Sequence, residues 1–201
     1  LPVPFVSMVT SRGCPFRCRY CSQVYVGGVY REQSADRVVE EVKRAVREYH
    51  AKEVIFFDET FTLTRKRILD VCQGILAAGL KVRWNVRTRM DRLDDELLAA
   101  MKAAGCWSIH VGIESGSPRV QKLMNKRLKL ERLPPVLSAA RRLGMETRGY
   151  FMLGYPGETR AEMEQTIRLA LELPLDWASF TITQPMAGTD IFHDALEQGL
   201  F

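Results

Sequence analysis

The stretch Trp107-Ser-Ile-His-Val-Gly-Ile-Glu114 carries the clearest indication of the fold. Its residues alternate between apolar and polar with the period of two that is typical of a β-strand. The apolar face consists of Trp107, Ile109, Val111 and Ile113. A parallel sheet that is covered by helices on both sides is apolar on both faces. One apolar and one polar face therefore predict a barrel wall whose polar side lines a lumen.

Five further segments have strand character. At residues 82–88 an apolar set again alternates with a polar set that includes Asn85 and Arg87. We place the side chains of Trp84 and Trp107 on the apolar faces, in the hydrophobic core. The six predicted strands are residues 5–10, 53–57, 82–88, 107–113, 146–152 and 177–183.

Amphipathic runs that end at glycine separate these strands. Gly79, Gly105 and Gly144 each follow such a run and precede an apolar or alternating segment, which is typical of a glycine just past the end of a helix. Thr159 and Glu162 fit a capping box at the start of another helix. The predicted helices are residues 34–49, 65–78, 95–104, 118–125, 131–143 and 160–172. Alternating strands and helices predict an α/β fold, a partial (βα)6 TIM-like barrel of parallel strands with outer helices.

Composition excludes several classes of protein. The chain has 201 residues, of which 46% are hydrophobic and 26% charged, and this excludes a disordered chain. The length favours one domain. No apolar stretch approaches the roughly 18 residues of a membrane span. The first residues have neither a signal-peptide core nor an initiator Met. We expect a fragment of a longer, cytoplasmic protein.

Basic residues are concentrated in one part of the chain. The net charge is +5, and residues 119–148 hold nine basic and two acidic residues. Such a stretch is compatible with contact to RNA or phosphate. The spacing favours the alternative, solvated helix faces, because apolar residues occur between the charges at helical spacing.

A cysteine-rich loop, Ser11-Arg-Gly-Cys-Pro-Phe-Arg-Cys-Arg-Tyr-Cys-Ser-Gln23, follows the first predicted strand. Cys14, Cys18 and Cys21 are close enough in sequence for one loop to bind a soft metal or an iron–sulfur cluster. Three ligands are too few for a closed zinc site, so one coordination position stays open. Cys72 falls within a predicted helix, where we expect a buried core thiol.

The C-x3-C-x-aromatic-C pattern resembles the signature of the radical SAM superfamily. The resemblance implies that Cys14, Cys18 and Cys21 hold a 4Fe–4S cluster and that S-adenosylmethionine chelates the fourth iron. It also implies an enzyme that cleaves S-adenosylmethionine reductively to methionine and a deoxyadenosyl radical. Tyr20 falls at the aromatic position that approaches the adenine in that family.

Further segments resemble family landmarks at the ends of later strands. Where many members carry Gly-Gly-Glu for the methionine amino group, this chain has Asp58-Glu59-Thr60, and Asp58 or Glu59 would replace that glutamate. Gly112-Ile-Glu-Ser-Gly-Ser117 resembles the ribose-binding segment. The resemblance places Glu114 at the sugar hydroxyls, with Ser115 beside it.

Three residues complete the expected cofactor site. Tyr150 and Gly154 belong to a segment, residues 150–159, that resembles the part of the family lining the adenine. Arg87 could bind the methionine carboxylate through its planar guanidinium, or form a structural salt bridge inside the barrel. His110 would face the lumen, where it would serve as a proton donor or a substrate contact, or be satisfied by polar neighbours.

Within the superfamily, the segments are most similar to members that follow a cobalamin-binding domain. We therefore expect residues 1–201 to be a radical SAM core domain, preceded in the full protein by a cobalamin-binding domain. That similarity implies methyl transfer to an unreactive carbon of a small-molecule substrate, with an electron donor such as a flavodoxin or ferredoxin. The alternatives are an enzyme similar to the tRNA methylthiotransferases and a non-catalytic metal- or RNA-binding module.

Overall fold

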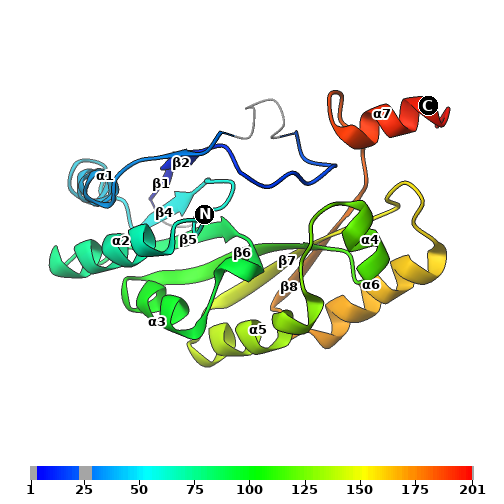
Figure 1. Ribbon diagram of the computed structural model, residues 1–201. Coiled ribbons are helices and arrows are strands. Elements are labelled where there is room, and N and C mark those ends of the chain that lie inside the picture. Colours follow the sequence, from blue (N-terminus) through cyan, green and yellow to red (C-terminus); the bar gives the residue numbers. More distant parts are fainter. Residues whose placement is uncertain (1–3, 23–28, 201) are drawn as a thin grey trace.

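Six parallel strands form the sheet of this protein. The computed structural model describes residues 4–22 and 29–200, so Gln23 of the cysteine loop lies outside the described residues. The strands pair in the order β1-β4-β5-β6-β7-β8, and in the described part of the chain no pairing joins β1 to β8. The sheet is therefore an open barrel, which confirms the predicted partial (βα)6 fold (Figure 1). The strands are β1 (Phe5–Met8), β4 (Glu53–Phe56), β5 (Arg83–Thr88), β6 (Cys106–Glu114), β7 (Glu146–Leu153) and β8 (Trp177–Ile182).

Helices cover the outer face of this sheet. Figure 1 shows α2, α3, α5 and α6 along one side of it, and α3 packs against both α2 and α5. The Thr159 side chain accepts a hydrogen bond from Glu162 N while the Glu162 carboxylate accepts from Thr159 N, which confirms the predicted capping box. The helices are α1 (Ala35–Glu48), α2 (Arg65–Ala77), α3 (Asp95–Ala103), α4 (Pro118–Leu123), α5 (Leu133–Arg142), α6 (Arg160–Glu172) and α7 (Asp190–Glu197).

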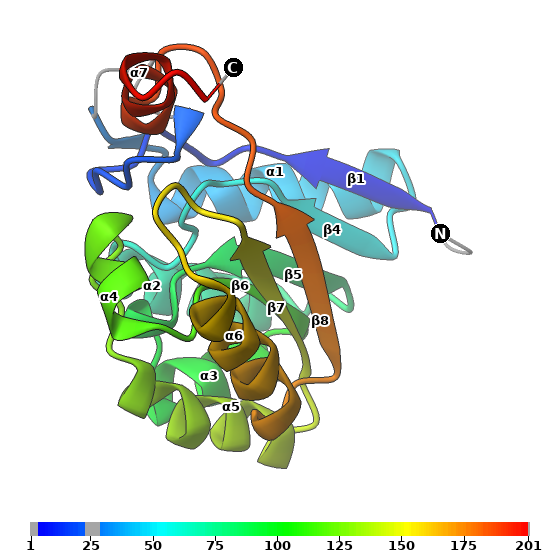
Figure 2. The same cartoon turned by 90° about the vertical axis from the view of Figure 1, so that its right-hand side faces the viewer.

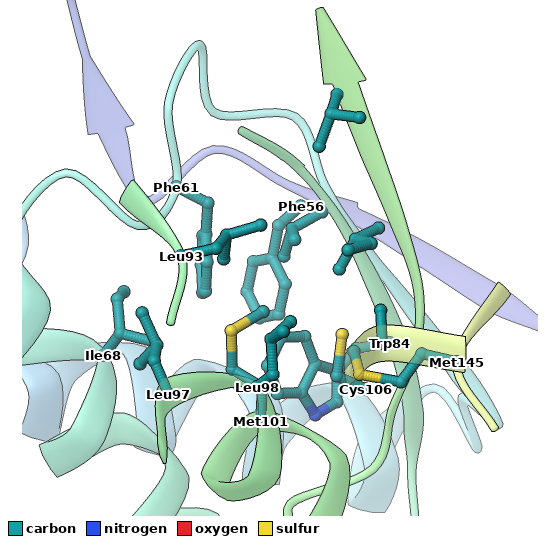
Figure 3. Close-up of a cluster of buried hydrophobic side chains, with 14 of the residues drawn as sticks. Phe56, Phe61, Ile68, Trp84, Leu93, Leu97, Leu98, Met101, Cys106 and Met145 are labelled. Carbon is teal, nitrogen blue, oxygen red and sulfur yellow. The ribbon is translucent and has the colours of Figure 1, made fainter. Parts of the chain in front are cut away.

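The hydrophobic core lies between the sheet and these helices. Phe56, Phe61 and Trp84 form an aromatic group in it, with Phe56 and Phe61 ring centroids 4.6 Å apart (Figure 3). Trp84 is buried as predicted, and its Nε1 donates to Ala104 O at 2.7 Å. Cys72 also lies in this core, and burial raises the pKa of its thiol to about 12.

Trp107 is not a core residue, contrary to the prediction. The pairing of β5 with β6 shifts by one residue between Trp84 and Asn85, which is a β-bulge. The extra residue turns Trp107 to the polar side. Its Nε1 donates to Glu53 Oε1 at 3.0 Å, and the Arg83 guanidinium lies 4.3 Å from the centre of its ring.

Two strands and one α-helix were not predicted, and all three lie at the cysteine loop. Strands β2 (Ser11–Arg12) and β3 (Arg31–Glu32) pair antiparallel and close the base of the loop. Helix α7 lies beyond the C-terminal ends of the barrel strands, near the loop (Figures 1 and 2). Of the helices that the structure describes, none has the length and apolar composition of a membrane span.

Candidate functional site

The cysteine loop and the C-terminal ends of the strands enclose one cavity. Its volume is about 260 Å³, and Cys14, Cys18 and Cys21 all line it. In parallel barrels this end of the strands carries the functional residues, because the loops converge there. The side chains that the strand ends and their loops contribute to the lining include Glu59, Arg87, Arg89, His110, Glu114 and Tyr150.

Contacts on two sides hold the cysteine loop in place. On one side, Arg19 N donates to Met124 O at 3.0 Å, and the Asn125 side chain donates to Arg17 O at 2.7 Å. On the other side, the Arg19 guanidinium donates to both carboxylate oxygens of Asp194 in α7, at 2.6 and 2.8 Å. The loop therefore depends on residues more than one hundred positions away for its shape.

The three cysteines fit an iron–sulfur cluster. None of them forms a disulfide, and Cys14 Sγ lies 3.7 Å from the Thr60 hydroxyl. Among residues 4–22 and 29–200, no three Cys, His, Asp or Glu side chains converge as ligands of a single metal ion. A cluster joins its cysteines through its own iron and sulfide atoms, so it needs thiolates that face a shared cavity. The chemistry of the donor set and the common cavity meet this requirement.

Arg89 lies against the cysteine loop. Its Nη1 lies 3.8 Å from Cys18 Sγ, and its guanidinium lies 3.9 Å from the centre of the Phe16 ring. The side chain is 7% exposed and is held by Asp91 and by Lys126 O. The Arg89 guanidinium therefore places a positive charge beside the Cys18 sulfur. From the sequence, Arg89 had been one of the residues of the third strand, with Arg87, that could reach the methionine carboxylate.

Glu114 and Lys126 form a buried ion pair in the cavity wall. Lys126 Nζ donates to Glu114 Oε1 at 2.7 Å, and the two side chains are 6% and 11% exposed. Lys126 also donates to the Tyr20 hydroxyl at 3.3 Å. Sequence reasoning missed Lys126 because it lies in the basic stretch. Asn125 and Arg127, on either side, both have positive φ, and this tight turn accompanies its inward position.

The backbone is adapted to this ion pair. Glu114 has a φ of 70°, a left-handed conformation that costs free energy for a non-glycine residue. A Cβ atom at Gly112 would overlap the Glu114 carboxylate and would lie 2.7 Å from Lys126 Nζ. Glycine at position 112 therefore leaves room for both charged groups in their present positions, and a larger residue would make them shift.

Tyr20 places a neutral phenol beside the ion pair. Burial raises its pKa well above the usual value, and the negative charges of Glu114, Cys18 and Cys21 raise it further. The hydroxyl therefore keeps its proton at neutral pH. Tyr20 lines the cavity with the cysteines, on the loop where the resemblance had placed it.

The structure distinguishes Asp58 from Glu59, the two carboxylates that the sequence offered for the methionine amino group. Asp58 is fully buried and accepts hydrogen bonds from Thr10 N, Thr10 Oγ1 and the Ser11 hydroxyl, so it holds the segment after β1. Asp58 is not part of the cavity lining. Glu59 lines the cavity, and its Oε2 is buried with no hydrogen-bond partner among the described residues.

The remaining expected cofactor residues fall into two groups. Arg87 and Tyr150 line the cavity. Ser115 and Gly154 do not, since the Ser115 hydroxyl lies 3.2 Å from Thr166 Oγ1 and Gly154 N donates to Glu158 Oε2 at 2.7 Å. These two residues shape the loops behind the cavity wall.

Comparison with known proteins places the chain in a family. The family model described as the radical SAM superfamily matches residues 8–170. The uncharacterized methyltransferase PH0819 of Pyrococcus horikoshii is 38% identical over 199 residues, which cover 98% of this chain and 43% of that protein. Cytidylyl-2-hydroxyethylphosphonate methyltransferase of Streptomyces wedmorensis is 32% identical over 200 residues, which cover 96% of this chain and 38% of that protein. The chain thus spans less than half the length of these relatives.

A solved structure has the same fold. It is the radical S-adenosylmethionine methyltransferase TsrM from Kitasatospora setae, with cobalamin and a 4Fe–4S cluster bound. The TM-score is 0.86 at 20% identity, and the match covers 98% of this chain and 40% of that chain. At this identity the likeness shows the fold alone. Because the family model covers most of the sequence, the chain belongs to the radical SAM superfamily.

Proposed function

We propose that this chain is the catalytic core of a radical SAM methyltransferase. The observation that carries the proposal is that the three cysteines of the loop line the same cavity as Glu59, Glu114 and Lys126. Superfamily membership implies a 4Fe–4S cluster and S-adenosylmethionine, together with a reductant and a substrate. When bound, the cluster supplies one electron that cleaves the sulfonium of S-adenosylmethionine, which yields methionine and a deoxyadenosyl radical.

Different residues of the cavity bind the cluster and the methionine part of S-adenosylmethionine. Cys14, Cys18 and Cys21 ligate the cluster, and Glu59 accepts hydrogen bonds from the methionine amino group. Its buried oxygen without a partner is suited to that amino group, because a buried acceptor gains most from a charged donor. Arg87 offers its guanidinium to the methionine carboxylate.

The nucleoside part of S-adenosylmethionine contacts the part of the wall that contains Glu114, Lys126, Tyr20 and Tyr150. Glu114 accepts hydrogen bonds from the ribose hydroxyls, and Lys126 is the positioning residue that holds its carboxylate toward the cavity. Tyr20 and Tyr150 pack beside the adenine, while Ser115 and Gly154 shape the loops behind them. The left-handed backbone at Glu114 supports this assignment, since such conformations cluster at functional sites.

The methyl-transfer part of the proposal draws on the relatives. Two of them are named methyltransferases, and TsrM is a methyltransferase with cobalamin bound. We propose that residues 1–201 form the core domain and that a cobalamin-binding domain belongs to the full protein. The substrate is a small molecule, the electron donor is a flavodoxin or ferredoxin, and the compartment is the reducing cytoplasm.

A methylthiotransferase that acts on tRNA is less well supported. The tRNA-2-methylthio-N(6)-dimethylallyladenosine synthase of Clostridium botulinum is 27% identical over 180 residues, below the methyltransferases above. The basic stretch that favoured RNA is partly used inside the protein. Lys126 is buried in its pair with Glu114, whereas Arg119 and Arg142 pair with Glu162 and Asp95 at the surface.

Anaerobic reconstitution of the full-length protein tests the proposal. The wild type should bind about four irons per chain, turn brown and release deoxyadenosine from S-adenosylmethionine when reduced. Cys14→Ala, Cys18→Ala and Cys21→Ala should each lose cleavage to background, because each removes one cluster ligand. Cys72→Ala is the matched control and should keep wild-type iron and cleavage. Normal cleavage in any of the three loop variants would overturn the proposal.

A further inference from the structure

Four side chains form one row across the polar face of the sheet. The register aligns Arg87 of β5 with His110 of β6, His110 with Arg148 of β7, and Arg148 with Trp177 of β8. Aligned residues of neighbouring strands point to the same face. Arg87 and His110 line the cavity that holds the cysteines, so the row extends from that cavity into the lumen.

The two arginines of the row differ from the other cavity cations. Arg89 and Lys126 each contact a carboxylate. Among the described residues, no acidic side chain forms a salt bridge with Arg87 or Arg148, and the buried Arg148 Nε has no hydrogen-bond partner. Each guanidinium instead lies over an aromatic ring, Arg87 4.7 Å from the centre of Phe57 and Arg148 5.6 Å from Trp177.

Ring contacts orient a guanidinium without using its N–H groups. A cation over a ring is attracted by the ring face, while the N–H donors at the edge stay available for an oxyanion. Phe57 and Trp177 therefore orient the guanidinium groups of Arg87 and Arg148 and leave their N–H donors available. The positive charges also remain uncompensated, which raises the local potential for an anion.

His110 reports this positive potential. Burial lowers the pKa of its imidazole, and the charges of Arg148 and Arg87 lower it further, against a smaller opposite effect of Glu146. The Tyr150 hydroxyl lies 3.2 Å from His110 Nδ1. The neutral imidazole and the phenol thus add polar groups between the two arginines and no negative charge.

We propose that the row Arg87–His110–Arg148 binds an oxyanion of the substrate, a carboxylate or a phospho group. The inference rests on the proposed function, since it places the anion next to the cavity assigned to S-adenosylmethionine. Arg148 is the main ligand, because its Nε is the buried donor without a partner. Arg87, which we assign to the neighbouring methionine carboxylate, adds its positive charge to the row, and Arg148 contacts the substrate alone. The row holds the oxyanion of the substrate in the lumen. The remaining atoms of the substrate are then free to extend toward the cysteines.

Anion titration of the reconstituted full-length protein tests this inference. We would measure calorimetric binding of inorganic phosphate and, separately, of acetate, with S-adenosylmethionine at saturation. The wild type should bind one of them at one site per chain, and the preferred probe tells a phospho group from a carboxylate. Arg148→Gln should weaken binding by about tenfold or more, because a charge-assisted hydrogen bond is worth at least that factor. Arg148→Lys should recover part of the affinity.

The control variant has the same Arg-to-Gln substitution at a position outside the row. Arg168→Gln lies on the exposed side of α6 and should bind the anion like the wild type. Equal weakening in Arg148→Gln and Arg168→Gln would overturn the inference, as would loss of anion binding when S-adenosylmethionine is added. Thermal melting checks that each variant is folded. Protein that is brown and cleaves S-adenosylmethionine but binds neither anion would contradict this inference alone, whereas protein without a cluster would contradict the proposed function.

Discussion

The two ends of the barrel lumen each bury a glutamate, and they satisfy it in opposite ways. At the N-terminal end of the strands, Glu53 is 2% exposed and accepts from Asn85 Nδ2 at 2.9 Å and Trp107 Nε1 at 3.0 Å. At the C-terminal end, Glu114 pairs with the Lys126 ammonium beside an open cavity and adopts a left-handed backbone.

The difference between Glu53 and Glu114 indicates that one site stabilises the fold and the other binds a ligand. Neutral donors satisfy the Glu53 carboxylate, and its backbone is not left-handed, as expected of a structural site. At Glu114 a desolvated ion pair and an unfavourable φ both cost free energy. Such a cost in free energy is retained where a ligand binds the groups. We therefore expect substitutions near Glu114 to change S-adenosylmethionine affinity, and substitutions near Glu53 to change only the free energy of unfolding.

The largest effect is expected for Lys126→Met. The change leaves the Glu114 carboxylate buried without its partner, which should lower the free energy of unfolding by about 3 kcal/mol and S-adenosylmethionine affinity by about a hundredfold. Urea denaturation and equilibrium binding measure the two effects. Lys122→Met, on the exposed side of α4, is the control and should change neither. Unchanged affinity in Lys126→Met would remove this pair from the cofactor site.

Gly112→Ala should follow with a smaller effect. Its new methyl group overlaps the Glu114 carboxylate and displaces the ion pair, so we expect about a tenfold weaker S-adenosylmethionine complex and a destabilisation of about 1–3 kcal/mol. The cluster content should stay at the wild-type level, because the atoms nearest the new methyl group belong to Glu114 and Lys126 and not to the cysteine loop. An alanine variant with wild-type affinity would show that the pair is free to move.

Trp107→Phe tests the other end of the lumen. The ring under Arg83 is kept and one hydrogen bond to Glu53 is lost, so the free energy of unfolding should fall by about 1 kcal/mol. S-adenosylmethionine affinity should be unchanged, since this end does not line the cavity. A loss of affinity as large as that of Gly112→Ala would abolish the distinction between the two ends.

The smallest effect concerns pH and His110. Because its pKa is lowered by burial and by Arg148 and Arg87, the native state binds fewer protons than the unfolded chain below pH ~6.5. Native-state stability should therefore decrease as the pH falls from about 6.5 toward the native pKa, and this contribution should be constant above that range. Glu146 and Tyr150, which face the same imidazole, are unchanged in His110→Asn. That variant should lack this part of the pH dependence in denaturation curves measured from pH 5 to 8.

Much of the barrel follows from local patterns. The alternation in Trp107–Glu114, the glycines after the helices and the capping box at Thr159 are properties of neighbouring residues, and the structure confirms the elements that they predicted. Helix α7 was missed, although Thr189 caps it and Ile191 and Ala195 give its buried side. Attention to that cap would have predicted it.

The sequence by itself determined the order of strands and helices and a loop with three thiols at the spacing of a cluster, because both depend on residues close together in the chain. Only the tertiary structure decided that Lys126 meets Glu114, that Glu59 rather than Asp58 faces the cavity, and that Trp107 leaves the core. Those outcomes depend on strand register, on one bulge and on the direction of a turn. Each of these is set by packing between distant segments, and a local hydrophobic period carries no information about them.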